Sequence, residues 1–433
     1  MSGKAKATEA GDAARRAIDA VWRIESAKVI ASVARVVRDV ALAEELAQDA
    51  FVAALEHWGQ PGVGVPDKPG AWLMTTAKNK ALDRLRQHAL HARKHEEYGR
   101  DLDAQEAYVT PDFVDALDAA REDDIGDDLL RLIFTACHPV LSVDARAALT
   151  LRLIGGLTTD EIARAFLVPE PTIAQRIVRA KRTLSAARVP FEVPQADARA
   201  ARLGSVLEVI YLIFNEGYSA TAGDHWMRPA LCEDALRLGR ILAELTPDES
   251  EVHGLVALME IQASRMKARV DRDGRPVLLP DQDRSRWDPL LIRRGLAALK
   301  RSEALGGARG VYALQAALAA CHARAASAAD TDWPMIVALY DALMQTAPTP
   351  VVELNRAVAV SMAYGPDKAL PIVDALADAA SLSRYHWLPS VRADLLARLG
   401  RRDEARAEFE RAAALAKNAR EREFLMKRAG EMG

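Results

Sequence analysis

The stretch from Leu157 to Leu184 constrains the fold most, because it predicts two short helices joined by a tight turn. It reads LTTDEIARAFLVPEPTIAQRIVRAKRTL. Thr158 and Glu161 have the spacing of a capping box, in which each side chain satisfies a backbone N–H at the start of a helix. Proline then interrupts the pattern, and Pro171 can occupy the first turn of a second helix, where no N–H is needed. Two helices around such a turn predict a helix-turn-helix.

The second of these helices carries an unusual charge. Residues 176–188 contain five basic residues and no acidic one, although the whole chain has a formal charge of −3. The apolar residues from Ile173 to Leu184 recur at helical spacing and would form the buried face, which leaves a basic face opposite. Such a face can pair with DNA phosphates and reach base edges in the major groove. A solvated surface is the alternative, but the absence of acids and the helix-turn-helix pattern favour DNA binding.

Charge also divides the preceding part of the chain. Residues 78–95 hold six basic residues and one acidic residue, whereas residues 96–128 hold 13 acidic residues and two basic ones. The basic segment follows a loop rich in Gly and Pro, and its neighbour Trp72 could stack on the bases of melted nucleic acid or belong to the core. The acidic segment contains few large apolar residues, which predicts a linker.

Composition favours helices throughout the chain. Hydrophobic residues make up 50% of the 433 residues but aromatic residues only 5%, and Ala is abundant. Because Ala is the best helix former, we predict an all-α fold with two or three domains. No apolar run of about 18 residues and no signal-peptide pattern is visible, which predicts a cytoplasmic protein.

From about residue 200 onward the sequence has a weak repeat with a period of about 34 residues. Within LARLGRRDEARAEFERAAALA, small and aromatic residues stand at the spacing of a tetratricopeptide helix pair. They are Gly400, Ala405, Phe409 and Ala412. Ala235 with Pro247 and Tyr340 with Pro348 fit the same template, whereas residues 264–292 do not fit and predict an insertion or loop.

Two polar clusters in this C-terminal part could support chemistry. The first comprises Asp281, Asp283, Arg284, Arg286, Trp287 and Asp288, and the second comprises Glu216, Tyr218, His225 and Trp226. Carboxylates beside arginine can serve acid–base or phosphate chemistry, but charged clusters in helical repeats more often hold a loop in place. No nucleophile–base pair or metal-ligand spacing is visible, and the three cysteines are widely scattered. We therefore predict no catalytic residue, metal or cofactor, and treat the first cluster as a candidate regulatory site.

The order of motifs in residues 22–190 resembles an extracytoplasmic-function sigma factor of the sigma-70 family, the promoter-reading subunit of bacterial RNA polymerase. AEELAQDAFVAAL resembles the surface of region 2 that binds the polymerase clamp helices. AWLMTTAKNKALDRLR resembles the helix that reads and opens the −10 element, and the stretch at 157–184 resembles region 4, which reads the −35 element. The remaining 240 or so residues, with YLIFNEGYSA and DQDRSRWD, resemble the subgroup with a C-terminal tetratricopeptide-like domain.

The resemblance implies three contact surfaces. The polymerase surface comprises Glu45, Gln48, Asp49 and Phe51. The −10 surface comprises Lys78, Asn79, Lys80, Asp83, Arg84 and Arg86. The −35 surface comprises Thr172, Gln175, Arg176, Arg179 and Lys181.

The resemblance also implies a domain order and partners. The expected segments are region 2 (15–95), an acidic linker (96–126), region 4 (127–190) and a regulatory tetratricopeptide-like domain (198–433). The partners would be core RNA polymerase, through its clamp helices and flap, promoter DNA, and a small cytoplasmic YCII-related protein. The linker would run along the polymerase, or would fold over the basic helices and mask them in the free protein.

Other functions stay open at this point. A one-component regulator would bind DNA through residues 142–188 and sense a ligand or partner in its helical domain, but would give AEELAQDAFVAAL no role. A scaffold built on the repeats would leave both basic helices unexplained. An enzyme would need the carboxylates of DQDRSRWD.

Overall fold

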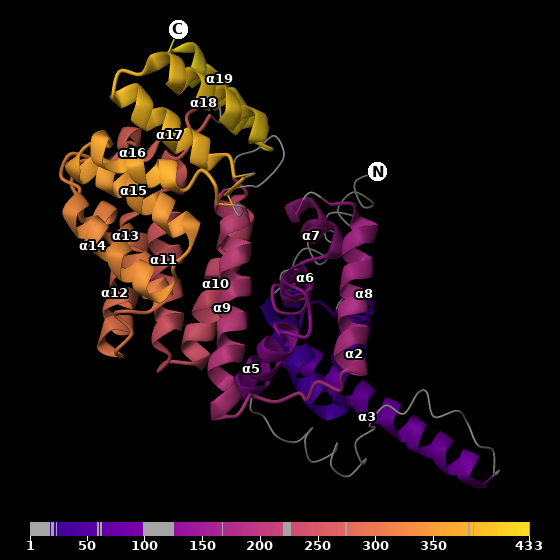
Figure 1. The fold of residues 1–433 in the computed structure, drawn as a ribbon. Coiled ribbons are helices and arrows are strands. Elements are labelled where there is room, and N and C mark those ends of the chain that lie inside the picture. Colours follow the sequence, from indigo (N-terminus) through magenta and orange to yellow (C-terminus); the bar gives the residue numbers. More distant parts are fainter. Residues whose placement is uncertain are drawn as a thin grey trace, which may run out of the picture. The chain divides into compact units, whose positions relative to one another are not determined.

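The computed structural model shows a helical chain (Figure 1). It describes residues 18, 21–22, 24–58, 60, 63–97, 125–166, 168–219, 227–272, 275–379, 382–383 and 385–432. Among these residues there is one isolated β-bridge, between Val270 and Pro276, and no sheet, so the predicted all-α fold is confirmed. None of the described helices is long and apolar enough to cross a membrane. Most of the predicted acidic linker (98–124) and the residues His225 and Trp226 lie outside the described residues.

The chain divides into two compact units, and the boundary in the sequence falls between Val209 and Ile210. The first described helical residues of unit 1 are 18, 21–22 and 24–37, and they are followed by α2 (Val40–Trp58) and α3 (Pro69–Glu97). Arg38 has a φ of 54° and ends the first helix, and the Asp39 carboxylate accepts a hydrogen bond from the Leu42 N–H (2.8 Å) at the start of the next. The Trp58 and Trp72 rings meet edge to face at 5.1 Å and hold α2 against α3.

The second half of unit 1 contains α5 (Ile125–Ala136), α6 (Val143–Leu153), α7 (Thr159–Phe166) and α8 (Glu170–Ala186). The capping box is present: the Thr158 N–H donates to Glu161 Oε2 at 2.8 Å, and the Glu161 N–H donates to Thr158 Oγ1 at 3.1 Å. Pro169 is the N-cap of α8, and the buried residues of this helix are Ile173, Ile177, Ala180 and Leu184. The predicted helix-turn-helix is therefore confirmed.

A long helix, α9 (Ala196–Tyr218), begins in unit 1 and continues into unit 2. Its first half is bound to the helices before it. Arg202 donates to the Phe134 carbonyl at 2.8 Å, and the Ser205 hydroxyl donates to the Cys137 carbonyl at 2.6 Å. The first turns of α9 therefore belong structurally with α5 and α6.

Unit 2 continues with ten further helices among its described residues. They are α10 (Pro229–Leu245), α11 (Ser250–Ser264), α12 (Pro289–Ala304), α13 (Val311–Arg324), α14 (Trp333–Thr346), α15 (Pro350–Tyr364), α16 (Pro366–Ala375), α17 (Trp387–Arg398), α18 (Arg402–Leu415) and α19 (Ala419–Gly430). Successive helices pack against one another, as α11 with α12 and α17 with α18. Residues 265–288 contain three 3-10 turns and no α-helix where described.

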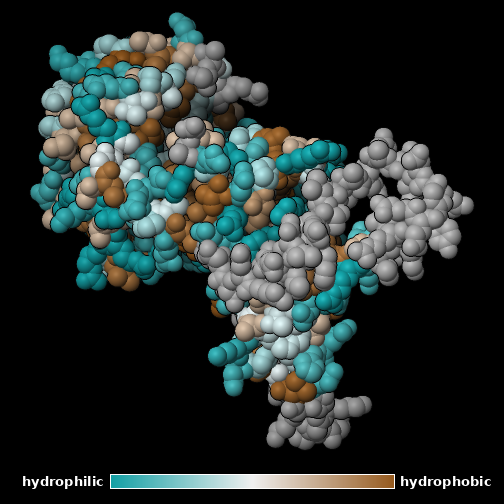
Figure 2. Space-filling model, turned by 90° about the horizontal axis from the view of Figure 1, so that it is seen from below, coloured by the Kyte–Doolittle hydropathy of each residue, from teal (hydrophilic) through white to brown (hydrophobic). Residues whose placement is uncertain are grey.

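The positions that match the tetratricopeptide template lie in this packed interior. Ala405, Phe409 and Ala412 are buried, and Gly400 takes a φ of 79° in the turn between α17 and α18. Small buried residues let paired helices approach closely, but the tetratricopeptide-like character of the unit stays a prediction. On the face shown in Figure 2, hydrophobic residues lie in small groups among hydrophilic ones.

Candidate nucleic-acid and polymerase interfaces

Most of the predicted −35 surface lies together on α8. Thr172, Gln175 and Arg179 are exposed, and Arg176 is half-buried with an ion pair to Asp144 at 3.6 Å. Arg182 is exposed on the same face, three residues after Arg179, although the resemblance did not single it out. Its helical spacing from Arg179 was the available signal.

The four predicted −35 residues Thr172, Gln175, Arg176 and Arg179 lie at a groove of 380 Å³ between α8 and the N-terminus of α6. The groove is lined by Val140, Leu141, Ser142, Ala145, Thr172, Gln175, Arg176, Arg179, Ala180 and Thr183. The N-terminus of α6 contributes the positive end of a helix dipole, and the Asp144 carboxylate in its first turn pairs with Arg176. Two arginines beside a helix N-terminus form a surface suited to phosphate groups.

Lys181 is the exception among the predicted −35 residues. Its ammonium forms an ion pair with Glu44, a buried residue of α2. The same carboxylate accepts hydrogen bonds from Arg152 Nε and Gln48 Nε2, both at 2.7 Å. Lys181 is therefore turned toward α2, and neither Glu44 nor Arg152 was singled out from the sequence.

The predicted −10 surface lies along the outer side of α3. Asn79, Asp83, Arg84 and Arg86 are exposed, and Lys78 and Lys80 are half-buried. The opposite side is buried and comprises Leu73, Ala77, Ala81 and Leu85. Asp83, the one acid of the surface, pairs with Arg86 at 3.1 Å, so the surface stays predominantly cationic.

Trp72 does not belong to that outer surface. Its ring is half-buried, meets Trp58 and stacks on His57 with the ring centres 6.0 Å apart. These contacts favour the core interpretation over stacking on nucleic acid.

The predicted polymerase surface on α2 combines acidic and apolar groups. Glu45 and Asp49 are exposed, and the neighbouring Val52 is 50% exposed. Phe51 is half-buried and packs on Trp22, with the ring centres 4.7 Å apart. Gln48 is half-buried because its amide is bound to Glu44. This arrangement suits a basic helical partner with apolar side chains.

The candidate regulatory residues of unit 2 mainly hold their own segment in place. The Asp283 carboxylate accepts from Ser285, and these hydrogen bonds lower the pKa of Asp283. The Asp288 carboxylate caps α12 by accepting from the Leu290 N–H at 2.9 Å and the Leu291 N–H at 3.2 Å. Asp281 and Arg286 are exposed, and Trp287 is buried. No group of residues in the described part of the chain has the arrangement of a metal site.

Arginines contact the two described members of the second polar cluster, Glu216 and Tyr218. Glu216 pairs with Arg228, and the Arg269 guanidinium lies 3.5 Å from the centre of the Tyr218 ring. Arg265 donates to the Tyr218 hydroxyl at 2.8 Å. No sequence pattern pointed to Arg265 and Arg269, because their partner Tyr218 lies about 50 residues away in the chain.

Burial shifts the pKa of two cysteine thiols. It raises the pKa of Cys137 to about 11 and that of Cys232 to about 12. Both thiols are therefore protonated at neutral pH and are poor nucleophiles.

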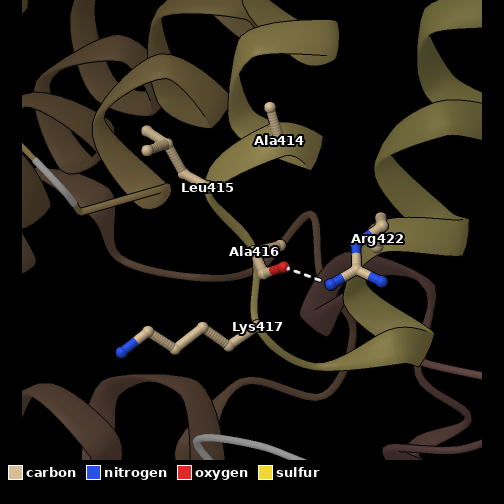
Figure 3. A pocket seen from close by; sticks show the side chains of 5 residues that line it. All are labelled: Ala414, Leu415, Ala416, Lys417 and Arg422. Carbon is tan, nitrogen blue, oxygen red and sulfur yellow. Dashed lines mark hydrogen bonds between the residues drawn. The ribbon is translucent and has the colours of Figure 1, made fainter.

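A pocket of 450 Å³ lies at the junction of α18 and α19 (Figure 3). It is lined by Ala414, Leu415, Ala416, Lys417 and Arg422. Arg422 of α19 donates a hydrogen bond to the Ala416 carbonyl at 2.8 Å, and this bond ties α19 to the connection that follows α18. The lining offers no acid–base pair.

Comparisons with known families agree with this division of the chain. Residues 24–90 match the model described as "Sigma-70 region 2", and residues 131–184 match "Sigma-70, region 4". Residues 202–303 match a "Family of unknown function (DUF6596)".

Individual relatives fall into two groups. "Uncharacterized protein R00370" of Rhizobium meliloti (strain 1021) is 45% identical over 393 residues, which cover 90% of each chain. "ECF RNA polymerase sigma factor SigK" of Mycobacterium ulcerans (strain Agy99) is 30% identical over 36% of this chain and 78% of its own length. "RNA polymerase sigma factor CarQ" of Myxococcus xanthus is 32% identical over 35% of this chain and 77% of its own length.

Proposed function

This chain belongs to the extracytoplasmic-function sigma factors of the sigma-70 family, and we propose which of its surfaces carry out each step of that function. It is an alternative sigma factor that binds core RNA polymerase and promoter DNA and directs transcription initiation. Such a factor acts by binding and not as an enzyme. The region 2 match also accounts for AEELAQDAFVAAL, to which a one-component regulator would give no role.

The −35 element binds to the exposed face of α8 in this proposal. The observation that carries it is that Arg176 and Lys181 are held in ion pairs, whereas Arg179 and Arg182 are exposed on the same helix. Their charges are thus available to phosphates or to guanine edges. Thr172 and Gln175, at the N-terminal end of α8, are placed to contact bases, as in other helix-turn-helix proteins.

The −10 element binds along α3. Arg84 and Asn79 are exposed, and Lys80 is half-buried on the same helix. Cations along one helix face neutralise the backbone of a melted strand, while the Asn79 amide can donate to and accept from a base edge. Strand opening is then favoured because α3 binds the single strand more tightly than the duplex.

Core polymerase binds the face of α2 that carries Glu45, Asp49 and Phe51. Two exposed carboxylates beside an apolar contact complement a basic helical surface, which we assign to the clamp helices. Region 4 is assigned to the flap. Double substitution of Glu45 and Asp49 by Lys should weaken core binding most at low salt, because like charges would then face each other.

Unit 2 is proposed to regulate initiation, and a small cytoplasmic YCII-related protein is its proposed partner. Support comes from α9, a single helix whose first half is bound to α5 and α6 and whose second half lies in unit 2. A change in unit 2 can therefore act on the helix that contacts region 4. We also propose a cytoplasmic location, where core polymerase acts.

The test is run-off transcription with core RNA polymerase from the promoter of the protein's own gene. The full chain should give a specific transcript that depends on core polymerase. The same assay on a truncation after Val209, which retains the contacts of Arg202 and Ser205, shows how removal of unit 2 changes the amount of transcript. A lost transcript would make unit 2 an activating element, and an increased one would make it an inhibitor. Tight promoter binding without core polymerase, and no transcript, would contradict the proposal.

A further inference from the structure

Arg265 connects two sequence motifs of unit 2. It is the C-cap of α11, and its guanidinium donates to the hydroxyl of Tyr218, the last residue of α9, at 2.8 Å. The guanidinium carbon also lies 5.8 Å from the centre of the Trp287 ring. Tyr218 belongs to YLIFNEGYSA and Trp287 to DQDRSRWD, so the two motifs meet at one arginine. All three residues lie within 202–303, the match to a family of unknown function, and outside both sigma matches.

Two buried N–H donors at this junction lack a hydrogen-bond partner. Arg265 is 9% exposed and Trp287 is 6% exposed. Neither Arg265 Nε nor Trp287 Nε1 has a hydrogen-bond partner in the described part of the chain. Because buried polar groups in folded proteins are nearly always hydrogen-bonded, these two neighbouring donors require an acceptor from outside the described residues.

The junction also carries an excess of positive charge. The Arg284 guanidinium lies 4.7 Å from the centre of the same Trp287 ring, so two cations share one aromatic side chain. Burial and the charge of Arg265 lower the pKa of Arg284 more than the exposed Asp330 raises it. The hydrogen bonds of the two arginines go to neutral oxygens, which are those of the Tyr218 hydroxyl, the Gln262 amide and the His322 and Ala325 carbonyls. Since neighbouring buried charges of one sign are unfavourable, a bound anion would stabilise this arrangement.

We propose that Arg265, Arg284 and Trp287 form a binding site for a small oxyanion, either a phosphate or a carboxylate. Its oxygens accept hydrogen bonds from Arg265 Nε and Trp287 Nε1, and Arg284 supplies the second positive charge. A water molecule could accept the same hydrogen bonds, but only an anion also neutralises the two cations. The ligand is small because Arg265 and Trp287 are buried, and the site borders the surface because Arg284 is half-buried.

The indole N–H of Trp287 reports directly on the ligand in the full-length protein. Nuclear magnetic resonance of protein labelled with ¹⁵N-tryptophan resolves the indole signals, and Trp287→Phe identifies this one among the seven tryptophans. Titration with sodium phosphate, at neutral pH and at an ionic strength held constant with sodium chloride, should move the signal downfield until it saturates. A parallel titration with sodium acetate distinguishes the two ligand classes: the salt that saturates the site at the lower concentration identifies a phosphate or a carboxylate ligand.

Three substitutions, measured by isothermal titration calorimetry with the same salt, test the residues of the site. Trp287→Phe removes the N–H but keeps an aromatic ring beside both arginines, and should weaken binding about tenfold or more, as expected for one lost hydrogen bond to a charged group. Arg265→Gln removes a charge and the Nε donor, and should abolish binding. Arg286→Gln, an exposed arginine of the same motif, should leave binding unchanged. Circular dichroism and thermal melting establish that each variant is folded, and Trp287→Phe keeps the test valid if Arg265→Gln does not fold.

Two results would overturn the site. The first is a Trp287 signal that responds to neither salt. The second is equal binding by the unaltered protein, Trp287→Phe and Arg265→Gln, which would show that the anion binds only to surface cations. Neither measurement depends on polymerase or promoter DNA, so the absence of a core-dependent transcript would contradict the proposed function and leave the oxyanion site standing.

Discussion

The Arg284 guanidinium lies 4.7 Å from the centre of the Trp287 ring, so a cation and an aromatic ring of the same 3-10 turn face each other. The same guanidinium donates to the carbonyls of His322 and Ala325, at 2.5 and 2.7 Å. These two carbonyls lie at the C-terminus of α13, where helical carbonyls lack intrahelical partners. Arg284 therefore connects the irregular segment 265–288 to the helix that follows α12.

Replacing Arg284 by Ala should destabilise unit 2 by about 2 kcal/mol, because two hydrogen bonds and a cation–π contact are lost together. Urea denaturation followed by circular dichroism measures the change. Arg286→Ala is the matched control, because Arg286 is exposed and its hydrogen bond to the Val270 carbonyl is 3.5 Å long. The control should stay within about 0.5 kcal/mol of the unaltered protein. Equal effects of the two substitutions would contradict the structural role of Arg284.

The stability of unit 2 should fall at acidic pH because of His322. Burial, together with Arg265 and Arg284, lowers the pKa of His322 to about 4 from 6.5. Above pH 6.5 the residue is neutral in both states and has no effect. Below that pH His322 is protonated in the unfolded chain but stays neutral in the folded chain. The free energy of unfolding therefore declines until about pH 4, by at most about 3 kcal/mol.

Urea denaturation between pH 7.5 and 4.5 tests this, with His322→Gln as the comparison. The substituted protein lacks the titrating group, so its stability should fall less steeply over the same interval. Parallel curves for the two proteins would contradict the lowered pKa of His322.

Asp288→Ala should destabilise unit 2 by about 1 kcal/mol, the usual effect of losing a helix N-cap. The Asp288 carboxylate accepts two backbone N–H groups at the start of α12. Asp281→Ala is a suitable control, because Asp281 is exposed in the same sequence motif and caps no α-helix. The measurement is the thermal midpoint of each variant. A large effect of Asp281→Ala on transcription without an effect on stability would indicate a regulatory contact there.

Arg179→Ala should weaken binding to −35 duplexes of any sequence and reduce the slope of log affinity against log salt by about 1, the signature of one lost phosphate contact. Arg179 is exposed on α8 and lines the groove beside α6. Arg301→Ala, which removes an exposed arginine of unit 2, should leave both affinity and slope unchanged. A loss of affinity confined to one base position would show that Arg179 reads a base instead.

Local features of the structure could be predicted from the sequence where the interacting groups are neighbours in the chain. Thr158 and Glu161 are three residues apart, and their capping box is present as expected. The same holds for the buried side of α8, since helical spacing alone predicts Ile173 and Leu184 on one face. Likewise, Ala405 and Phe409 stand four residues apart in the sequence, and both are buried in the structure.

The sequence by itself thus determined the all-α class, the helix-turn-helix and the family, because these depend on short-range spacing and on motifs read along the chain. Tertiary structure alone decided which charged residues become partners when they lie far apart in the chain. Glu44 and Arg152 are 108 positions apart, and no periodicity relates a carboxylate on α2 to cations on α6 and α8. The physical reason is that burial creates the requirement for a counter-charge, and which cation meets it depends on how the helices pack.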